Sequence, residues 1–255
     1  MIDTHSHIYL EEFDADRTDV VQRAKAAGVE KIVLPNIDEN TLSALIMLEQ
    51  SEPNYFYAAI GLHPTSVNAD WAKQLQFVKN QLQKQKFIAV GEIGLDFYWD
   101  KTFAVEQTAA FEQQILLALK YDLPIIVHSR DSFDACFYIV NKYDTLTGVF
   151  HSFGGTAEQA QKIISLGGRF KIGVNGVVTF KNSGLGDVLK NIPLEYIVLE
   201  TDAPYLTPVP FRGKRNESAY LTFILQKLAE IYETSESEIE KKTVENTLKL
   251  FKNII

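Results

Sequence analysis

Short apolar runs and amphipathic stretches alternate along the whole chain. Eight apolar and β-branched runs indicate strands, at residues 2–7, 31–37, 56–63, 87–94, 124–129, 147–153, 169–174 and 196–202. Between them, apolar residues recur at helical spacing, in faces marked by Trp71, Leu75, Val78 and Leu82, by Phe111, Ile115 and Leu119, and by Leu221, Leu225, Leu228 and Tyr232. The pattern therefore predicts alternating strands and helices.

The last segment carries the signals of a final helix. Ser235 and Glu238 form a candidate capping box, in which each side chain bonds the backbone N–H of the other residue. Val244, Leu248 and Phe251 then predict the apolar stripe with which this helix packs.

This alternation also predicts the fold class, because parallel strands need crossover connections that are usually helices. Eight such units in 255 residues match a (β/α)8 TIM barrel, and we expect a single domain of this α/β type over residues 1–255. A doubly wound open sheet is the alternative, but it often has a Gly-rich phosphate turn after the first strand. Here the first strand runs into Ser6-His7-Ile8-Tyr9, so the barrel is favoured.

Net charge narrows the range of partners. The chain has 33 acidic and 25 basic residues, a net charge of −8, which argues against a broad nucleic-acid-coating surface because polyanion affinity comes from Lys and Arg. The charge still allows an enzyme that grips a few phosphates locally, since bound cations would supply positive charge.

Other features concern the cellular setting. No apolar run approaches the roughly 20 residues of a membrane span, and the N-terminus shows neither a basic region nor an apolar signal core. The single cysteine, Cys136, excludes an intrachain disulfide and fits a reducing compartment. We therefore expect a cytoplasmic monomer with no membrane association and no obligate protein partner.

All five histidines lie at the carboxyl ends of predicted strands, and so do two acids, Glu92 and Asp202. In a barrel these ends meet at one rim, where active sites are built. Buried imidazoles and carboxylates without a cation would carry a heavy desolvation cost, so the set predicts a metal centre. Its predicted ligands are His5, His7, Glu92, His128, His151 and Asp202.

The local setting of these residues suggests roles. His5 and His7 are two apart on a strand, so both point to one side and can bind one ion together. Glu92 follows an apolar strand between two glycines and has room to bridge two ions. Asp202 can bind a metal and take a proton from bound water, so Asp202 and Glu92 are the predicted catalytic residues. We expect two divalent cations (Mg, Mn or Zn), which would activate a shared water and neutralise charge on substrate oxygens.

Further polar residues near this rim have open roles. Asp96 is either a partner of a ligand or a loop acid, and Glu200 either a hydrogen bonder inside the barrel or a site residue. Arg130 follows His128 by two residues, and Arg212 opens a basic run after the last strand. Positive charge beside a metal centre suggests an anionic substrate, although a solvated surface loop explains the run equally well.

Motifs along the chain resemble those of the TatD family of metal-dependent deoxyribonucleases. From Ile2 to the C-terminal helix they occur in order at matching strand ends: Asp3-Thr-His-Ser-His7, Gly61-Leu-His-Pro64, Gly91-Glu-Ile-Gly-Leu-Asp96, Val127-His-Ser-Arg-Asp131, Phe150-His-Ser-Phe153, Val178-Thr-Phe-Lys181, Glu200-Thr-Asp-Ala-Pro204 and Arg212-Gly-Lys-Arg-Asn216.

The resemblance implies hydrolysis of phosphodiester bonds in DNA at a binuclear site. It implies that one ion is held by His5, His7, Glu92 and Asp202, and the other by Glu92, His128 and His151. It also implies that His63 and Arg130 lie near the substrate phosphate, and Arg212 is a third predicted substrate-binding residue.

Three positions depart from the family pattern. Phe211 stands where a histidine often precedes the Arg-Gly-Lys run, Ser218 where a proline is usual, and Thr65 where a second histidine often follows His-Pro. None is a predicted ligand, so these changes bear on substrate contacts and loop geometry.

Two other functions fit parts of the pattern. The same ligands would serve an amidohydrolase, lactonase or ester deacylase that acts on a small anionic substrate, and the acidic composition mildly favours it. A non-catalytic, metal-stabilised module fits less well, because structural zinc sites favour closed tetrahedral sets often rich in cysteine. A DNA-directed metal hydrolase, with DNA as its substrate, is the leading hypothesis.

Overall fold

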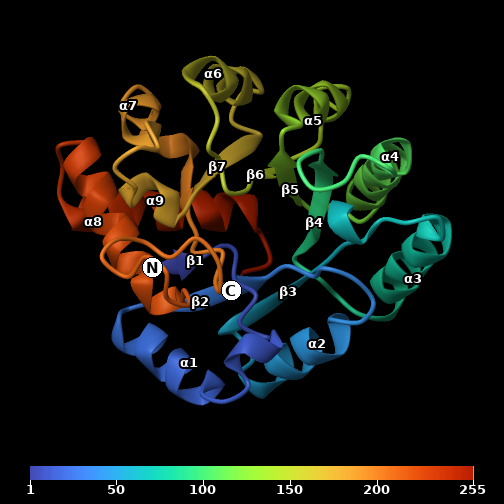
Figure 1. The fold of residues 1–255 in the computed structure, drawn as a ribbon, viewed down its shortest axis with the longest axis horizontal. Coiled ribbons are helices and arrows are strands. Elements are labelled where there is room, and N and C mark those ends of the chain that lie inside the picture. The colour runs from blue at the N-terminus through green and yellow to red at the C-terminus, as the bar shows by residue number, and fades with distance from the viewer. Residues whose placement is uncertain (255) are drawn as a thin grey trace.

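Residues 1–254 are described in a computed structural model, and they contain a barrel of eight parallel strands (Figure 1). Sequence neighbours are sheet neighbours throughout, from the first strand to the eighth. The ring closes between its ends through backbone bonds from Thr4 N to Leu199 O (3.0 Å) and from Asp202 N to His5 O (2.9 Å). The predicted α/β barrel is confirmed. Its strands are β1 (Ile2–Asp3), β2 (Lys31–Leu34), β3 (Phe56–Ile60), β4 (Ala89–Asp96), β5 (Ile125–Arg130), β6 (Gly148–Phe150), β7 (Phe170–Val174) and β8 (Ile197–Leu199).

Helices surround the strands, as Figure 1 shows. The predicted faces pack inward, with Leu75, Val78 and Leu82 buried on α3 and Leu221, Leu225 and Leu228 on α8. No helix of residues 1–254 is long and apolar enough to cross a membrane. The helices are α1 (Arg17–Ala26), α2 (Leu42–Ser51), α3 (Trp71–Lys84), α4 (Ala104–Lys120), α5 (Phe133–Val140), α6 (Ala157–Ser165), α7 (Leu185–Leu189), α8 (Leu221–Ile231) and α9 (Glu236–Leu250).

Alternate strand residues face two separate cores. Ile32 and Leu34 of β2 pack with the surrounding helices, whereas Val33 between them points into the barrel. Successive strand side chains point to opposite faces, so one short strand supplies both cores. The inner core also contains Leu250 and Phe251 at the end of α9, which therefore plug one mouth of the barrel.

The buried face of α9 differs from the apolar stripe that the sequence predicted. Of the predicted stripe, Phe251 is buried but Leu248 is 41% exposed, and the rest of the buried face is formed by Ile239, Thr243, Asn246, Thr247 and Leu250. Asn246 donates to the carbonyls of Leu194 and Ile197, both at 2.8 Å, so the helix is held by hydrogen bonds to the loop before β8 and to β8 itself. Ser235 accepts from Glu238 N at 3.2 Å, which is half of the predicted capping box.

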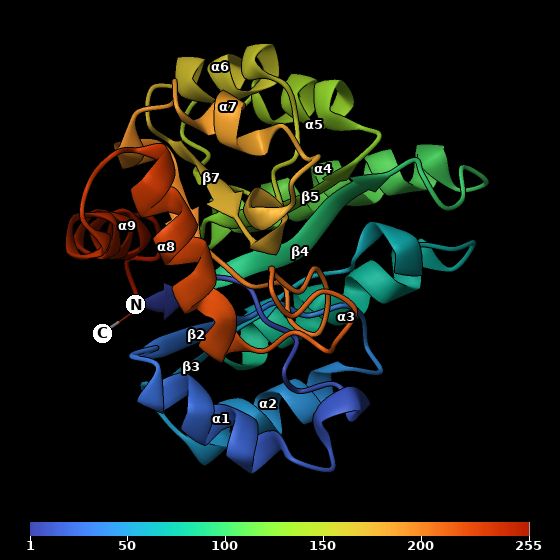
Figure 2. The same ribbon diagram turned by 60° about the vertical axis from the view of Figure 1, so that its left-hand side comes forward.

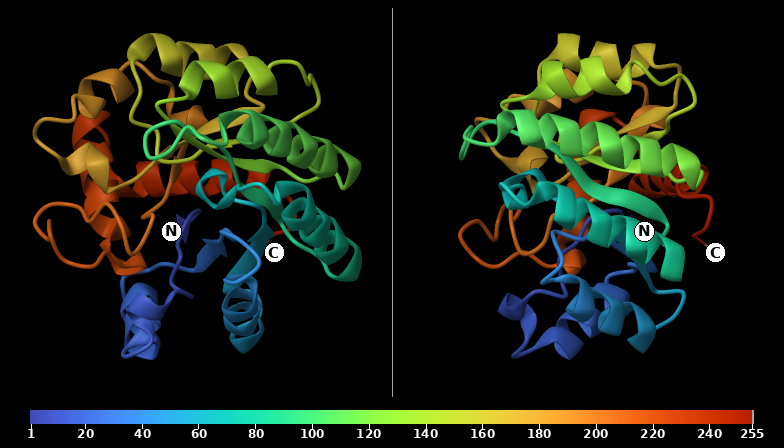
Figure 3. Two further views of the ribbon diagram at one scale, coloured as in Figure 1. Left: turned by 45° about the vertical axis from the view of Figure 1, so that its right-hand side comes forward. Right: turned by 90° about the vertical axis from the view of Figure 1, so that its right-hand side faces the viewer.

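The other mouth of the barrel belongs to the loops that follow the strands. Figures 2 and 3 show α9 and the N-terminus toward one end, and the orange loop after β8 toward the opposite end. Several strands end earlier than predicted, β1 at Asp3 and β8 at Leu199, so His5 and Asp202 lie in the loops just beyond. Backbone pairing persists there as a single bridge between Ser6 and Ala203, which keeps these loops in register.

Gly94 allows β4 and β5 to approach closely beside the site. A Cβ added to Gly94 (φ +144°) would lie 2.0 Å from His128 O, whereas one on Gly167 (φ +69°) would meet nothing within 4 Å.

Gly167→Ala should cost about 1 kcal/mol through its backbone conformation alone. Gly94→Ala should cost about 2 kcal/mol more, because β5 must shift. Urea unfolding of both variants checks this difference, and equal losses would contradict it.

Candidate metal centre

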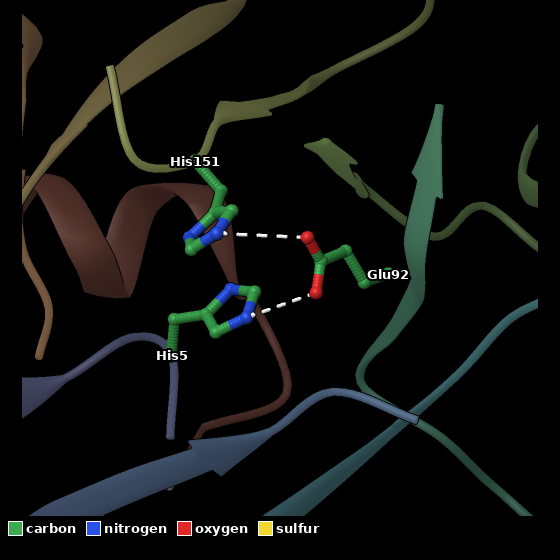
Figure 4. A group of neighbouring side chains, drawn as sticks. All are labelled: His5, Glu92 and His151. Carbon is green, nitrogen blue, oxygen red and sulfur yellow. Dashed lines mark ion pairs between the residues drawn. The ribbon is translucent and has the colours of Figure 1, made fainter. Parts of the chain in front are cut away.

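The carboxylate of Glu92, on β4, faces a stacked pair of imidazoles, His5 and His151, that come from the ends of β1 and β6 (Figure 4). Its Oε2 is 3.1 Å from His5 Nε2, and its Oε1 is 3.5 Å from His151 Nε2. The two imidazoles stack with ring centres 3.5 Å apart. Oε1 is also 2.8 Å from His128 Nδ1, so each oxygen of Glu92 faces a different group of histidines.

A second group of possible ligand atoms converges on the Oε2 side of Glu92. The Nε2 atoms of His5 and His7 lie 3.1 Å apart, and Asp202 Oδ1 is 3.8 Å from each of them. For Zn–N bonds of 2.0–2.1 Å, two imidazole nitrogens on one tetrahedral ion are about 3.3 Å apart. His5 Nδ1 is buried without a hydrogen-bond partner among the described residues, so this ring depends on what its Nε2 binds. The donor set fits a divalent cation.

Two ligand candidates are oriented by partners behind them. His7 Nδ1 is 2.9 Å from Tyr9 Oη, which donates to Pro35 O, so Nδ1 carries the proton and Nε2 keeps its lone pair. His128 Nε2 is 2.9 Å from Asp96 Oδ2, which leaves Nδ1 directed at Glu92. Such outer bonds fix the tautomer and ring orientation of metal-binding histidines.

Glu200 lies behind the ring of His151, as Tyr9 and Asp96 lie behind those of His7 and His128. Its Oε1 lies 3.1 Å from His151 Nδ1 and accepts a 2.6 Å hydrogen bond from Ser152 N. Gly173 makes room for it, because a Cβ there would lie 2.3 Å from Glu200 Oε2. Asp96 and Glu200, whose roles the sequence left open, therefore both contact predicted ligands.

His63 also reaches the cluster, with Nε2 3.4 Å from Glu92 Oε1. Three groups have ligand atoms within 4.8 Å of one another: His5, Glu92 and His151; His5, His7 and Asp202; and His63, Glu92 and His128. Thr65 N donates to His63 Nδ1 at 3.2 Å, and Thr65 Oγ1 lies 2.7 Å from it. Because Nδ1 accepts, Nε2 carries the hydrogen, which suits His63 as a donor to substrate rather than as a ligand.

Asp3 anchors the first loop to the last. Its Oδ1 accepts from His5 N (3.3 Å) and Thr201 N (2.9 Å), and its Oδ2 accepts from Thr201 Oγ1 (2.6 Å). Asp3 and Tyr9 were not predicted as site residues. The signal available was the two-residue spacing of Asp3, His5, His7 and Tyr9, which places all four on one side of an extended chain.

Burial and mutual charge set the protonation of the cluster. Burial lowers the pKa of His7 to about 4 and raises that of Asp202 to about 7. Burial would also lower the pKa of His151, but Glu200, Glu92 and Asp202 outweigh it and raise that pKa to about 10. Burial would raise the pKa of Glu92, yet the surrounding histidines hold it well below its usual range. Opposed shifts of this kind are typical of functional sites.

The cluster opens into a cleft of about 640 Å³, which Arg130 and Trp99 also line. Arg212 is not among its lining residues, because its guanidinium lies 3.7 Å from the centre of the Phe180 ring. Arg215 bonds Asp16 at 2.8 Å, so much of the basic run stabilises the loop itself. The structure thus brings His63 and Arg130 to the cleft and places Arg212 outside its lining.

A barrel whose rim carries buried imidazoles and carboxylates is the architecture of metal-dependent hydrolases. Residues 2–252 match the family model for TatD related DNase, so the chain belongs to the TatD family.

Similar proteins and a similar solved structure support this family assignment. The chain is 39% identical over 256 residues to the uncharacterized metal-dependent hydrolase YabD of Bacillus subtilis, covering 99% of both chains. It is 30% identical over 263 residues to a 3'-5' ssDNA/RNA exonuclease TatD of Pectobacterium parmentieri, again covering 99% of both. The crystal structure of YjjV, a TatD homologue from Escherichia coli, superposes with a TM-score of 0.91 at 34% identity, covering 99% of this chain and 98% of the other. The chain is thus a TatD-family metal-dependent hydrolase.

Metal uptake should release protons, because a protonated imidazole cannot bind a cation. With its pKa raised to about 10, His151 is protonated at neutral pH in the metal-free protein. Its proton must leave on binding, so apparent metal affinity should rise with pH between 7 and 10. Titration of metal-free protein with Mn²⁺ in weak buffer measures the release.

Glu200→Gln is the matched control for that titration. It removes the carboxylate that contributes most to the raised pKa of His151, so fewer protons should be released at pH 8.5. Equal proton release by the two proteins would show that His151 is not displaced from a protonated state.

Proposed function

We propose that this chain hydrolyses phosphodiester bonds in DNA at a centre that holds two divalent cations. The observation that carries the proposal is the position of Glu92, whose two oxygens face separate sets of imidazoles. One ion would be held by His5, His7, Glu92 and Asp202, and the other by Glu92, His128 and His151. Mg, Mn or Zn are suited to these donors, and such a pair supplies Lewis-acid activation of water and neutralises phosphate charge.

The protein's own residues supply proton transfer and binding. Asp202 lies at the end of β8 with its Oδ1 3.8 Å from the Nε2 atoms of both His5 and His7, so it would accept a proton from the attacking water beside the ion held there. As the water oxygen bonds to phosphorus, the P–O bond to the leaving nucleotide breaks, and the proton that Asp202 accepted passes to the leaving oxygen. His63 would donate from Nε2 to a non-bridging phosphate oxygen, and Arg130 would add positive charge at the cleft.

DNA is favoured as substrate by the name of one relative, a 3'-5' ssDNA/RNA exonuclease 30% identical to this chain. YabD and YjjV are named without a substrate, so small esters, lactones and N-acyl amino acids belong in the same assay.

Purified protein should cleave labelled single-stranded DNA once loaded with Mg²⁺, Mn²⁺ or Zn²⁺, and chelation with EDTA should abolish the activity. Gel analysis of the products and metal content of the same samples check both points. Absence of cleavage with all three metals, or faster turnover of a lactone or amide, would remove the nuclease assignment.

Asp202→Asn should separate chemistry from metal binding. Loss of the proton acceptor should lower kcat by about 10²–10⁴-fold. The double variant His5→Ala, His7→Ala should lose more metal, because it removes two neutral nitrogen donors rather than one oxygen. Metal analysis beside single-turnover rates distinguishes them, and near-normal turnover in Asp202→Asn would contradict its role as base.

A further inference from the structure

Two neighbouring aromatic side chains stand in solvent, and one of them, Trp99, lines the cleft. Tyr98 is 54% exposed and Trp99 70% exposed, on the loop between β4 and α4. Their rings meet edge to face, with centres 5.0 Å apart and planes at 86°. The guanidinium of Arg130 lies over both, 4.0 Å from the Tyr98 ring centre and 5.0 Å from that of Trp99. An aromatic pair held by an arginine is therefore presented beside the site.

The aromatic loop is attached to the cluster by one carboxylate. Asp96 Oδ1 accepts from Tyr98 N at 3.0 Å and Trp99 N at 3.3 Å, while its Oδ2 lies 2.9 Å from His128 Nε2. Trp99 and Arg130 line the same cleft as His128 and Glu92. The ring position is thus fixed relative to the place where the proposed reaction occurs.

From this placement we infer that Trp99, with Tyr98 and Arg130, forms a platform on which a nucleobase of single-stranded nucleic acid stacks next to the scissile phosphate. The inference rests on the proposed function and names the part of the substrate that this face binds. A base has an apolar face that matches an exposed indole, and such stacking tolerates any base. Inside a duplex both faces of each base are covered by its stacked neighbours, so the platform favours single strands.

The charge around the platform supports this occupant. Arg130 forms no ion pair with a carboxylate among residues 1–254, so its N–H groups remain available to a phosphate while its plane covers Tyr98. Of the other exposed large apolar residues, Tyr205 also lines the cleft, whereas Val105, Tyr138 and Leu248 lie on helices away from it. A substrate with both bases and phosphates matches the two features together.

Steady-state kinetics of the metal-loaded protein test the platform. Trp99→Ala should raise KM for a short single-stranded oligonucleotide about tenfold, in line with the loss of one stacked base. It should leave kcat and KM for bis(p-nitrophenyl) phosphate within twofold, because that ester does not need the platform. Trp99→Phe should restore most of the oligonucleotide KM. Tyr138→Ala, which removes an aromatic ring 69% exposed on α5, is the matched control and should change neither substrate.

A binding measurement separates failure of the platform from failure of the nuclease assignment. In a Trp71→Phe background Trp99 is the sole tryptophan, so a phosphorothioate oligothymidylate should quench its fluorescence saturably, and a closed circular duplex, which exposes no base face, should not. Quenching without cleavage of any DNA would overturn the proposed function and leave the platform standing. Absence of quenching, or an unchanged oligonucleotide KM in Trp99→Ala, would overturn the platform.

Discussion

The rest of the site depends on the burial of Glu92 among imidazoles. Its carboxylate is 3% exposed, and five histidines surround it without a basic side chain from Lys or Arg in the cluster. Such a buried cluster of a carboxylate and imidazoles is stable only if its lone pairs bind cations or protons, because an unpaired buried charge costs several kcal/mol. Neighbouring carboxylates raise the pKa of His151, so a cation would have to displace its proton, whereas burial lowers the pKa of His7 and keeps that ring neutral.

The barrel keeps its apolar core and its polar cluster at opposite mouths. Leu250 and Phe251 of α9 fill one mouth with the apolar inner core, so the polar cluster occupies only the other. Tyr9, Asp96 and Glu200 then form an outer layer, each directed at one histidine from a different strand end. Because the strand frame fixes the ligands and the outer layer fixes the orientation of their rings, a cation meets donors that are already oriented.

Periodicity sufficed to predict the barrel and the clustering of strand-end histidines, because both follow from local spacing combined with one topological rule. Two features lay beyond it. The spacing of apolar residues predicted that Leu248 is buried on α9. The helix is instead oriented by hydrogen bonds from Asn246 to carbonyls near β8, and such contacts between distant segments cannot be predicted from local spacing. Arg212 packs over the ring of Phe180, a contact that depends on how a long loop folds back and that local spacing does not predict.

The three departures from the family pattern are each accommodated locally. Thr65 contacts His63 Nδ1 and so sets the tautomer that directs its N–H at the cleft. Ser218 is buried and donates to Ser6 Oγ at 3.5 Å, in the loop that carries His5 and His7. Phe211 stacks on Tyr220 at 4.6 Å. All three changes act in the layer that positions ligands and loops. The three departures therefore alter the surroundings of the site and leave Glu92 and its imidazoles unchanged.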